Sequence, residues 1–166
     1  MKKPISLVVL IFLIQIVFIP TSRCNDLVNE TCKKIPRPNI CISILEADPR
    51  TEGSDIDGLA TIMVGEVERR ASDTLSKVNV LLRQKPRDKP LNDCHNNYVA
   101  ITRDDVPQAS GAIDAGDSGK AVQLMNDAVG MADSCEGGFK GHSPLTSANN
   151  GVKDVSSVAA AISRMI

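Results

Sequence analysis

Aromatic side chains are scarce in this chain of 166 residues, which contains no Trp, one Tyr and three Phe. Proteins that bind single-stranded nucleic acid stack the bases on aromatic side chains, and proteins that bind duplexes present a basic surface. The formal net charge is −1, and no basic stripe is visible. The composition therefore argues against a nucleic-acid-binding protein. It also argues against a protein whose function is to stack on sugar rings.

Residue patterns typical of catalytic and metal sites are absent as well. His95 and His142 are the only histidines that could serve as near-neutral bases, and neither lies in a recognisable catalytic motif. No Glu-x-x-His pair suits a metal site in a helical bundle. We therefore expect that the protein is not an enzyme and that it uses no metal and no cofactor.

Two short stretches only superficially resemble ligand-binding loops. Asp55-x-Asp57 and Glu66 have part of the acidic spacing of a calcium loop, but Ala60 stands where that loop requires glycine. Residues 116–121 lack the spacing of a phosphate-binding loop, and no strand precedes them. We interpret the first stretch as the start of a helix and the second as a turn between two helices.

The one long apolar run lies at the N-terminus. Lys2 and Lys3 precede the mostly apolar residues 5–19, and Ser22 and Cys24 place small side chains before a cleavage site. A membrane anchor is the weaker alternative, because a bilayer-spanning helix needs about 20 apolar residues. We predict a signal peptide over residues 1–24. The mature protein is then secreted, to the apoplast or the vacuole, and has no membrane contact.

Cleavage after residue 24 leaves an even number of cysteines in an oxidising compartment. These are Cys32, Cys41, Cys94 and Cys135, which allow three pairings. The pairing of sequence neighbours, Cys32 with Cys41 and Cys94 with Cys135, fits the helical pattern best. Metal-bound cysteines in a cytosolic protein are the alternative, which the signal peptide disfavours.

Secretion has two further consequences. Asn29, in the sequence Asn29-Glu30-Thr31, becomes a candidate glycosylation site. Loss of the three basic residues of the signal peptide leaves 16 basic and 20 acidic residues, so the mature chain has a net charge near −4. The mature protein is thus mildly acidic.

Apolar residues recur at helical spacing through the mature chain, and no segment has the pattern of a strand. Prolines separate two short helices, predicted over residues 25–35 and 39–47. A long amphipathic helix follows, which begins at a cap formed by Ser54 or Asp55 and runs to about Gln84. The two short helices are too small to have a core of their own, so a disulfide is expected to hold them together.

Residues 94–135 are central to the predicted fold, as two antiparallel helices joined by the turn 116–119 with a cysteine near each open end. Pro107 interrupts the first helix, where we expect a kink and a restart capped by Asp104 or Asp105. Both cysteines lie about twenty residues from the turn. A disulfide between them closes the base of this hairpin and leaves its tip free.

The last helix has its own start signal, with Ser143 as N-cap and Pro144 at the first helical position. The segments together predict an all-α fold. It consists of an up-down-up-down four-helix bundle over residues 51–166, preceded by an N-terminal helical hairpin over residues 25–50. We expect both parts to form one domain over residues 25–166.

Five motifs extend over the whole mature chain: Leu27-Val28-x3-Cys32 to Cys41, Ala47-Asp48-Pro49-Arg50, Gly58-Leu59-Ala60-x-Ile62-Met63-Val64, Cys135-Glu136-Gly137-Gly138-Phe139, and Ser143-Pro144-Leu145-Thr146. With this spacing the chain resembles the plant invertase and pectin methylesterase inhibitor family. The Asp-Pro-Arg and Ser-Pro-Leu-Thr segments are most similar to the branch that inhibits cell-wall and vacuolar β-fructofuranosidases. The resemblance implies a helical hairpin on a four-helix bundle, two disulfides between neighbouring cysteines, and an inhibitor of an enzyme.

The resemblance also assigns a role to the tip of the hairpin. In the invertase-inhibitor branch a Pro-Lys-Phe segment, just after the turn glycine, enters the active site of the enzyme. Here that proline and phenylalanine are missing, and the lysine comes one position later. The candidate inhibitory loop consists of Gly116, Asp117, Ser118, Gly119 and Lys120, in which Gly116 and Gly119 allow a sharp turn.

Two targets and one rival class of protein follow from these observations. The leading hypothesis is one-to-one blockage of the active-site cleft of a plant acid invertase, and inhibition of pectin methylesterase is the alternative. A non-inhibitory structural or carbohydrate-binding protein of the cell wall is the rival, which the scarcity of aromatic residues disfavours.

Overall fold

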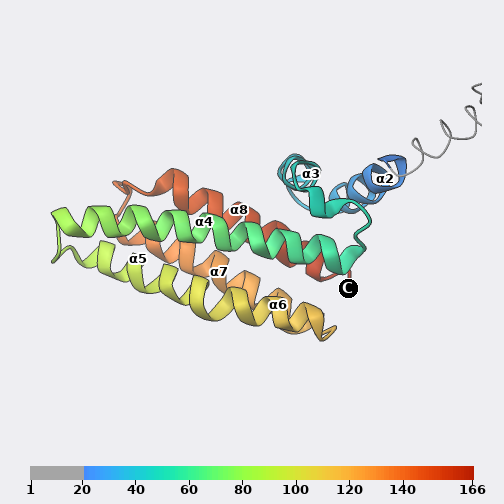
Figure 1. The fold of residues 1–166 in the computed structure, drawn as a ribbon. Coiled ribbons are helices and arrows are strands. Elements are labelled where there is room, and N and C mark those ends of the chain that lie inside the picture. Colours follow the sequence, from blue (N-terminus) through green and yellow to red (C-terminus); the bar gives the residue numbers. More distant parts are fainter. Residues whose placement is uncertain (1–20) are drawn as a thin grey trace, which may run out of the picture.

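The computed structural model describes residues 21–166, which form helices and connecting loops without a strand. Figure 1 shows these helices, which in chain order are α2 (Thr21–Cys32), α3 (Pro38–Ala47), the 3₁₀ turn η1 (Pro49–Thr51), α4 (Ile56–Gln84), α5 (Lys89–Ala100), the π-helical segment η2 (Ile101–Asp105), α6 (Val106–Asp114), α7 (Ser118–Gly138) and α8 (Thr146–Ser163). The predicted signal peptide lies for its greater part outside the described residues. Among those described, no helix is long and apolar enough to cross a membrane.

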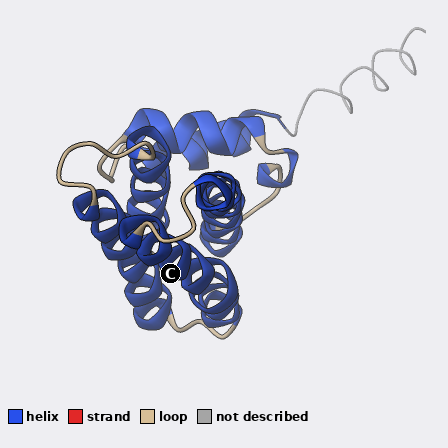
Figure 2. Cartoon of the chain, turned by 90° about the vertical axis from the view of Figure 1, so that its left-hand side faces the viewer, coloured by secondary structure: helices blue, strands red, loops and turns tan. Residues whose placement is uncertain are grey.

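The body of the molecule is a bundle of four rods: α4, the continuous arm α5–η2–α6, α7 and α8. Successive rods run antiparallel, and Figure 2 shows them end-on around a common core. The largest fully buried side chains of this core include Leu59, Met63, Tyr98, Met125 and Ile162. The predicted all-α, up-down-up-down bundle is therefore confirmed.

Helix α4 has the predicted bounds because both of its ends carry the expected chemistry. The Asp55 carboxylate accepts a hydrogen bond of 2.9 Å from the backbone N–H of Gly58, which satisfies one of the free donors of the first turn. At the other end Lys85 donates its backbone N–H to the carbonyl of Leu81 at 2.9 Å, just before Pro86. Between these caps one face is buried in the core, including Leu59, Ala60, Met63, Val67, Ala71 and Val78.

Helices α2 and α3 form the predicted N-terminal hairpin, which packs on α4 and α8. A disulfide joins Cys32 to Cys41, as predicted. In the turn between the helices Arg37 has a positive φ of 64°, and its guanidinium pairs with Asp154 of α8 at 3.0 Å. The hairpin is thus tied to the last helix of the bundle by an ion pair as well as by its buried apolar side chains.

The prediction that Ser143 caps the last helix is wrong. Helix α8 begins at Thr146, and the preceding residue, Leu145, provides no side-chain cap. The hydroxyl of Ser143 instead accepts a hydrogen bond of 3.1 Å from the backbone N–H of Leu145, within the turn before the helix. Ser143 and Pro144 therefore shape the approach to α8 and stand outside it.

The predicted side-chain cap before Pro107 is also wrong, although α6 begins at Val106 with Pro107 in its first turn, as predicted. Asp105 is in the helical region of the backbone and makes no side-chain cap, so the arm stays helical through the proline. The chain instead widens into the five-residue π segment η2, in which the backbone N–H of Val106 bonds to the carbonyl of Ile101. Proline in an α-helix lacks a donor and clashes with the carbonyl four residues earlier. A π turn directly before Pro107 relieves this conflict without a break.

Candidate functional site at the hairpin tip

The tip of the hairpin is a tight link between α6 and α7. Gly116 has a positive φ of 71° and donates its backbone N–H to the carbonyl of Ile113 at 2.9 Å. The next N–H, of Asp117, reaches the carbonyl of Ala112 at 2.8 Å. These two bonds form a Schellman motif, which satisfies the last carbonyls of α6 and requires the left-handed backbone that glycine adopts without a penalty.

Helix α7 begins immediately after this link. The Asp117 side chain caps it by accepting a hydrogen bond of 2.9 Å from the backbone N–H of Lys120. Ser118, Gly119 and Lys120 therefore form the first turn of a helix, and the prediction that the turn extends to Gly119 is wrong. A Cβ at Gly119 would meet the Asp117 carboxylate at 3.6 Å, an ordinary contact, so only Gly116 needs to be glycine here.

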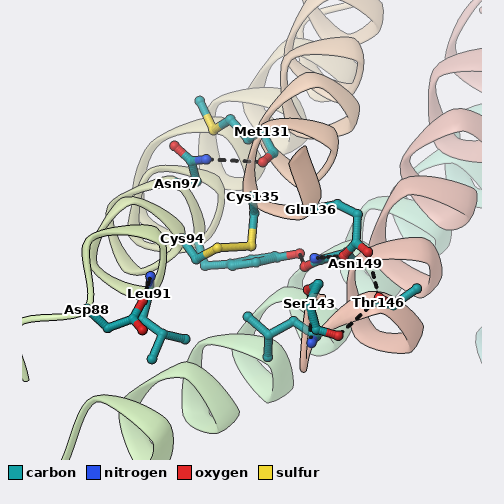
Figure 3. The surroundings of a disulfide bond; sticks show 12 residues. Asp88, Leu91, Cys94, Asn97, Met131, Cys135, Glu136, Ser143, Thr146 and Asn149 are labelled. Atoms are coloured by element: carbon teal, nitrogen blue, oxygen red, sulfur yellow. Dashed lines mark hydrogen bonds between the residues drawn. A yellow bond between two sulfur atoms is a disulfide. The ribbon is translucent and has the colours of Figure 1, made fainter. Parts of the chain in front are cut away.

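The base of the hairpin is fixed by the second disulfide. Cys94 of α5 and Cys135 of α7 are bonded, with their Cα atoms 4.8 Å apart (Figure 3), as predicted. Both cysteines are buried. One turn further along, the amide of Asn97 donates a hydrogen bond of 3.1 Å to the backbone carbonyl of Met131, again across the hairpin.

A buried polar network next to the disulfide joins the hairpin to α8. Figure 3 shows Glu136 facing Thr146 and Asn149, whose side chains donate to its two carboxylate oxygens at 2.5 Å and 2.6 Å. The Tyr98 hydroxyl donates to the amide oxygen of Asn149 at 2.7 Å. Burial opposes the charge of Glu136, but these hydrogen bonds hold its pKa below its usual range. Burial raises the pKa of the Tyr98 hydroxyl, which therefore stays protonated and remains a donor.

Sequence reasoning missed this network, although one signal for it is present. Asn149 falls between Leu145 and Val152 on the buried face of α8, where its side chain is almost fully enclosed. An amide at such a position needs partners from a neighbouring helix. The network makes the base of the hairpin rigid, so the tip is presented from a fixed support.

Lys120 is the only cation between Arg103 and Lys140 in the sequence, and its charge acts on the carboxyl of Asp105. Asp105 lies buried on η2, and burial together with the negative charges of Asp127 and Asp104 raises its pKa to about 6, while the charge of Lys120 acts to lower it. Among the described residues the Oδ2 atom of Asp105 has no hydrogen-bond partner. Lys120 is half-buried and forms no ion pair with a described residue.

A cleft of about 450 Å³ opens beside the tip, between the start of α4 and the end of α6. Its lining includes Asp114 at the end of α6 and Arg50 on η1. The Arg50 guanidinium is held by the carboxylate of Asp48, with Nη2–Oδ2 and Nε–Oδ1 distances of 2.6 Å and 3.0 Å. The hydrogen bonds from Arg50 lower the pKa of Asp48. Arg50 thus places a fixed ion pair with Asp48 near the tip, and the Asp-Pro-Arg segment is its signal in the sequence.

The remaining predicted features lie away from the tip. Asn29 is half-buried on α2, and its glycosylation remains a prediction. In the described part of the chain no group of three or more His, Cys, Asp or Glu side chains is arranged to hold a metal ion. The tip thus combines one lysine, Lys120, with the carboxyl groups of Asp105, Asp114 and Asp117 on a well-defined link between two helices.

Comparison with known proteins supplies the family. Residues 26–162 match the plant invertase/pectin methylesterase inhibitor family. The cell wall/vacuolar inhibitor of fructosidase 1 from Arabidopsis thaliana is 37% identical over 139 residues, which are 83% of this chain and 68% of that protein. A pectinesterase inhibitor from Actinidia deliciosa is 31% identical over 121 residues, 70% of this chain and 64% of that protein.

Solved structures support the fold. The crystal structure of a mutant form of a pectin methylesterase inhibitor from Arabidopsis superposes with a TM-score of 0.69 at 23% identity, over 81% of this chain and 93% of that chain. A second crystal structure, of a pectin methylesterase inhibitor from Arabidopsis thaliana, superposes with a TM-score of 0.61 over 83% of this chain. The members of this family are inhibitors and not enzymes, in agreement with the absence of catalytic motifs. Sequence and fold together show that the chain belongs to the plant invertase/pectin methylesterase inhibitor family.

Proposed function

We propose that the protein is a secreted inhibitor of plant acid invertase that blocks the active-site cleft in a one-to-one complex. The observation that carries this proposal is the 37% identity, over most of the chain, to a cell wall/vacuolar inhibitor of fructosidase. The name of that relative also supports an extracellular or vacuolar site of action for this protein.

The geometry of the tip supports a specific mode of inhibition. Glycosidases cleave their substrates with a pair of carboxylates, so the cleft of an invertase is expected to attract a cation. Lys120 supplies that cation from the first turn of α7, directly after a link that is fixed by the three hydrogen bonds described above. Because the disulfide and the buried network fix the base, little conformational entropy is lost when the tip binds.

Pectin methylesterase is a second candidate target, and one observation favours it. The Pro-Lys-Phe segment that the resemblance leads us to expect at the tip is replaced by Ser118-Gly119-Lys120. The pectinesterase inhibitor from Actinidia deliciosa is also 31% identical to this chain. The same bundle could therefore act on the esterase through a surface other than the tip.

One experiment separates the two targets. The mature protein, with both disulfides formed, is titrated against a purified acid invertase and a purified pectin methylesterase. We expect stoichiometric inhibition of the invertase and no inhibition of the esterase. Inhibition of the esterase alone would overturn the proposal in favour of the second candidate, and inhibition of neither would support a non-inhibitory protein.

A further inference from the structure

Basic side chains gather at the end of the bundle opposite the tip. The link between α4 and α5 and the link between α7 and α8 lie together at this end, whereas the α6–α7 link lies at the other (Figure 1). The two links and the helix ends next to them contain five cations, which we call the basic end: Arg83, Lys85, Arg87, Lys89 and Lys140. All five are exposed. Since the mature chain is acidic overall, this concentration of positive charge is local.

The carboxylates at this end are already engaged. Asp88 caps α5 by accepting a hydrogen bond of 3.1 Å from the backbone N–H of Leu91. Asp93 pairs with Lys89 at 2.6 Å, and Glu136 is held by Thr146 and Asn149. The other four cations, Arg83, Lys85, Arg87 and Lys140, form no ion pair with any residue in the described part of the chain.

An open cleft of about 540 Å³ lies at this end, and two of the cations, Lys85 and Lys140, line it together with Asp88. Lys85 contributes to one side of it, and Lys140 and His142 contribute to the other. Its remaining lining includes Pro90, Pro144 and Phe139, which is one of only two aromatic residues in the mature chain. The other aromatic, Tyr98, is fully buried, so the one aromatic ring in contact with solvent lies here.

We propose that the basic end binds a polyuronate, that is, a linear polysaccharide that carries a carboxylate on its sugar units. Lys85 and Lys140 in the cleft, with Arg83, Arg87 and Lys89 nearby in the sequence, match a chain of evenly spaced carboxylates. Binding would therefore rest on charge, with Phe139 and the prolines adding a small apolar contact and no extended aromatic platform. A secreted protein meets such polymers outside the cell, whereas the lack of further exposed aromatics disfavours single-stranded nucleic acid.

A linear polymer fits the charge distribution better than a flat anionic surface does. The screening length at physiological ionic strength is about 8 Å, so a polymer chain that contacts only the basic end does not sense the acidic remainder of the protein. A flat membrane surface would bring more of that acidic remainder close to its own negative charge. Val80 is the only large hydrophobic side chain that is strongly exposed among the described residues, which leaves little to insert into a bilayer.

Binding at the basic end leaves the tip free. Helix α4 has 29 residues, which corresponds to a length of about 43 Å, so the two ends are separated by several screening lengths. The polymer would hold the protein in place without occupying the surface that faces the target enzyme. This inference goes beyond the proposed function, and either can fail without the other.

The test uses the mature protein and a fully de-esterified polygalacturonate as the probe, at 50 mM salt. We expect binding that weakens steeply as salt is raised and is absent for the fully methyl-esterified polymer, which carries no charge. The double variant Lys85→Ala/Lys140→Ala should bind at least fivefold more weakly. Its matched control is Lys33→Ala/Lys34→Ala, which removes the same charge from exposed positions next to α2 and should bind within twofold of the wild type.

Three results would overturn the proposal. These are equal weakening by both double variants, binding that persists on the methyl-esterified polymer, and binding to phosphatidylserine vesicles without binding to polygalacturonate. Thermal melts of each variant show whether the fold is retained. Inhibition of the target enzyme by Lys85→Ala/Lys140→Ala should be unchanged, which separates this site from the tip.

Discussion

Tyr98 and Asn149 are joined by a hydrogen bond of 2.7 Å through the buried core, although they lie 51 residues apart in the sequence. The same amide also donates to Glu136, so Asn149 connects three rods of the bundle. The buried Tyr98 hydroxyl donates to Asn149, whereas Glu136 also accepts a hydrogen bond from Thr146. This relationship leads to the first prediction.

Replacement of Asn149 by leucine should lower the free energy of unfolding by about 2–4 kcal/mol. The substitution leaves the Tyr98 hydroxyl buried without an acceptor and removes one donor from the Glu136 carboxylate, and an unsatisfied buried group costs about 1–3 kcal/mol. Urea unfolding followed by circular dichroism measures the change. Tyr98→Phe in the Asn149→Leu background should restore part of the loss, because it removes the orphaned hydroxyl. No partial restoration would mean that the network contributes little.

The two disulfides should differ in how much they stabilise the protein. Replacement of Cys94 and Cys135 by serine opens a loop with a sequence separation of 41, which in the chain-entropy model corresponds to about 4 kcal/mol. The pair Cys32 and Cys41 has a separation of 9, which corresponds to about 3 kcal/mol. Removal of the Cys94–Cys135 bond should also reduce inhibition, since the base of the hairpin is no longer fixed. An unchanged melting temperature of that double variant would contradict the prediction.

The two glycines of the tip provide a matched pair of variants. Gly116→Ala should destabilise the protein by about 1–2 kcal/mol, because a Cβ is unfavourable at φ 71°. Gly119→Ala lies in the first turn of α7 and should be neutral or stabilise by up to about 1 kcal/mol, since alanine is favoured over glycine in a helix. Both values come from thermal or urea unfolding. Equal destabilisation by the two variants would mean that Gly119 also needs a backbone conformation that only glycine adopts easily. The non-helical link at the tip would then extend to residue 119.

Lys120→Ala should weaken inhibition of an acid invertase at least about thirtyfold, with the fold retained. The expected loss corresponds to about 2 kcal/mol or more, as is typical when one member of a buried interfacial charge pair is truncated. The inhibition constant measures it, and Lys77→Ala, an exposed lysine on α4, is the control. A change below threefold for Lys120→Ala would place the contact surface elsewhere on the bundle.

Asp105 should make the protein more stable in acid. Its pKa in the folded protein is about 6, above the ordinary value of 3.8, so the folded state holds a proton that the unfolded state has already released between these values. Stability is therefore expected to fall as pH rises from about 4 through 6, by at most about 3 kcal/mol. Asp105→Asn should remove this dependence, and urea unfolding at pH 4 to 7 measures it.

Two further variants check the cause of this pH dependence. Asp127→Asn should shift it to lower pH because the charge of Asp127 helps to raise the pKa of Asp105. Asp114→Asn removes an exposed carboxylate that does not act on Asp105 and should leave the pH dependence unchanged. If Asp105→Asn and Asp114→Asn had the same effect, the dependence would arise from the overall charge of the protein.

The features that sequence predicted well are those determined by local chemistry. The bounds of α4 follow from the cap at Asp55 and the proline after Lys85, and the disulfide partners follow from the antiparallel arrangement of two neighbouring helices. The turn glycine at 116 is likewise local, whereas the cap at Asp117 was not predicted.

The features that were missed depend on contacts between segments that are distant in the sequence. Serine is a residue type that often caps helices, which is why Ser143 was predicted to cap the last helix. The start of α8 is instead fixed by contacts with another helix, namely the hydrogen bonds of Thr146 and Asn149 to Glu136. Whether the helix breaks, restarts or widens at Pro107 depends on the packing of η2 against its neighbours, which include α4 and α7. At the candidate site, sequence located the tip and Lys120, but the buried Asp105 and the fixed Arg50 required the three-dimensional structure.

The π segment η2 also preserves the direction in which the tip faces. Each residue of an α-helix advances the chain by about 100° around the axis, so one surplus residue in an ordinary helix would rotate α6, and the link after it, by that angle. The wider turn of η2, in which the backbone N–H of Val106 bonds to the carbonyl of Ile101, takes up one such residue. The orientation of the tip therefore depends on a wide turn one helix away as well as on the sequence of the tip itself.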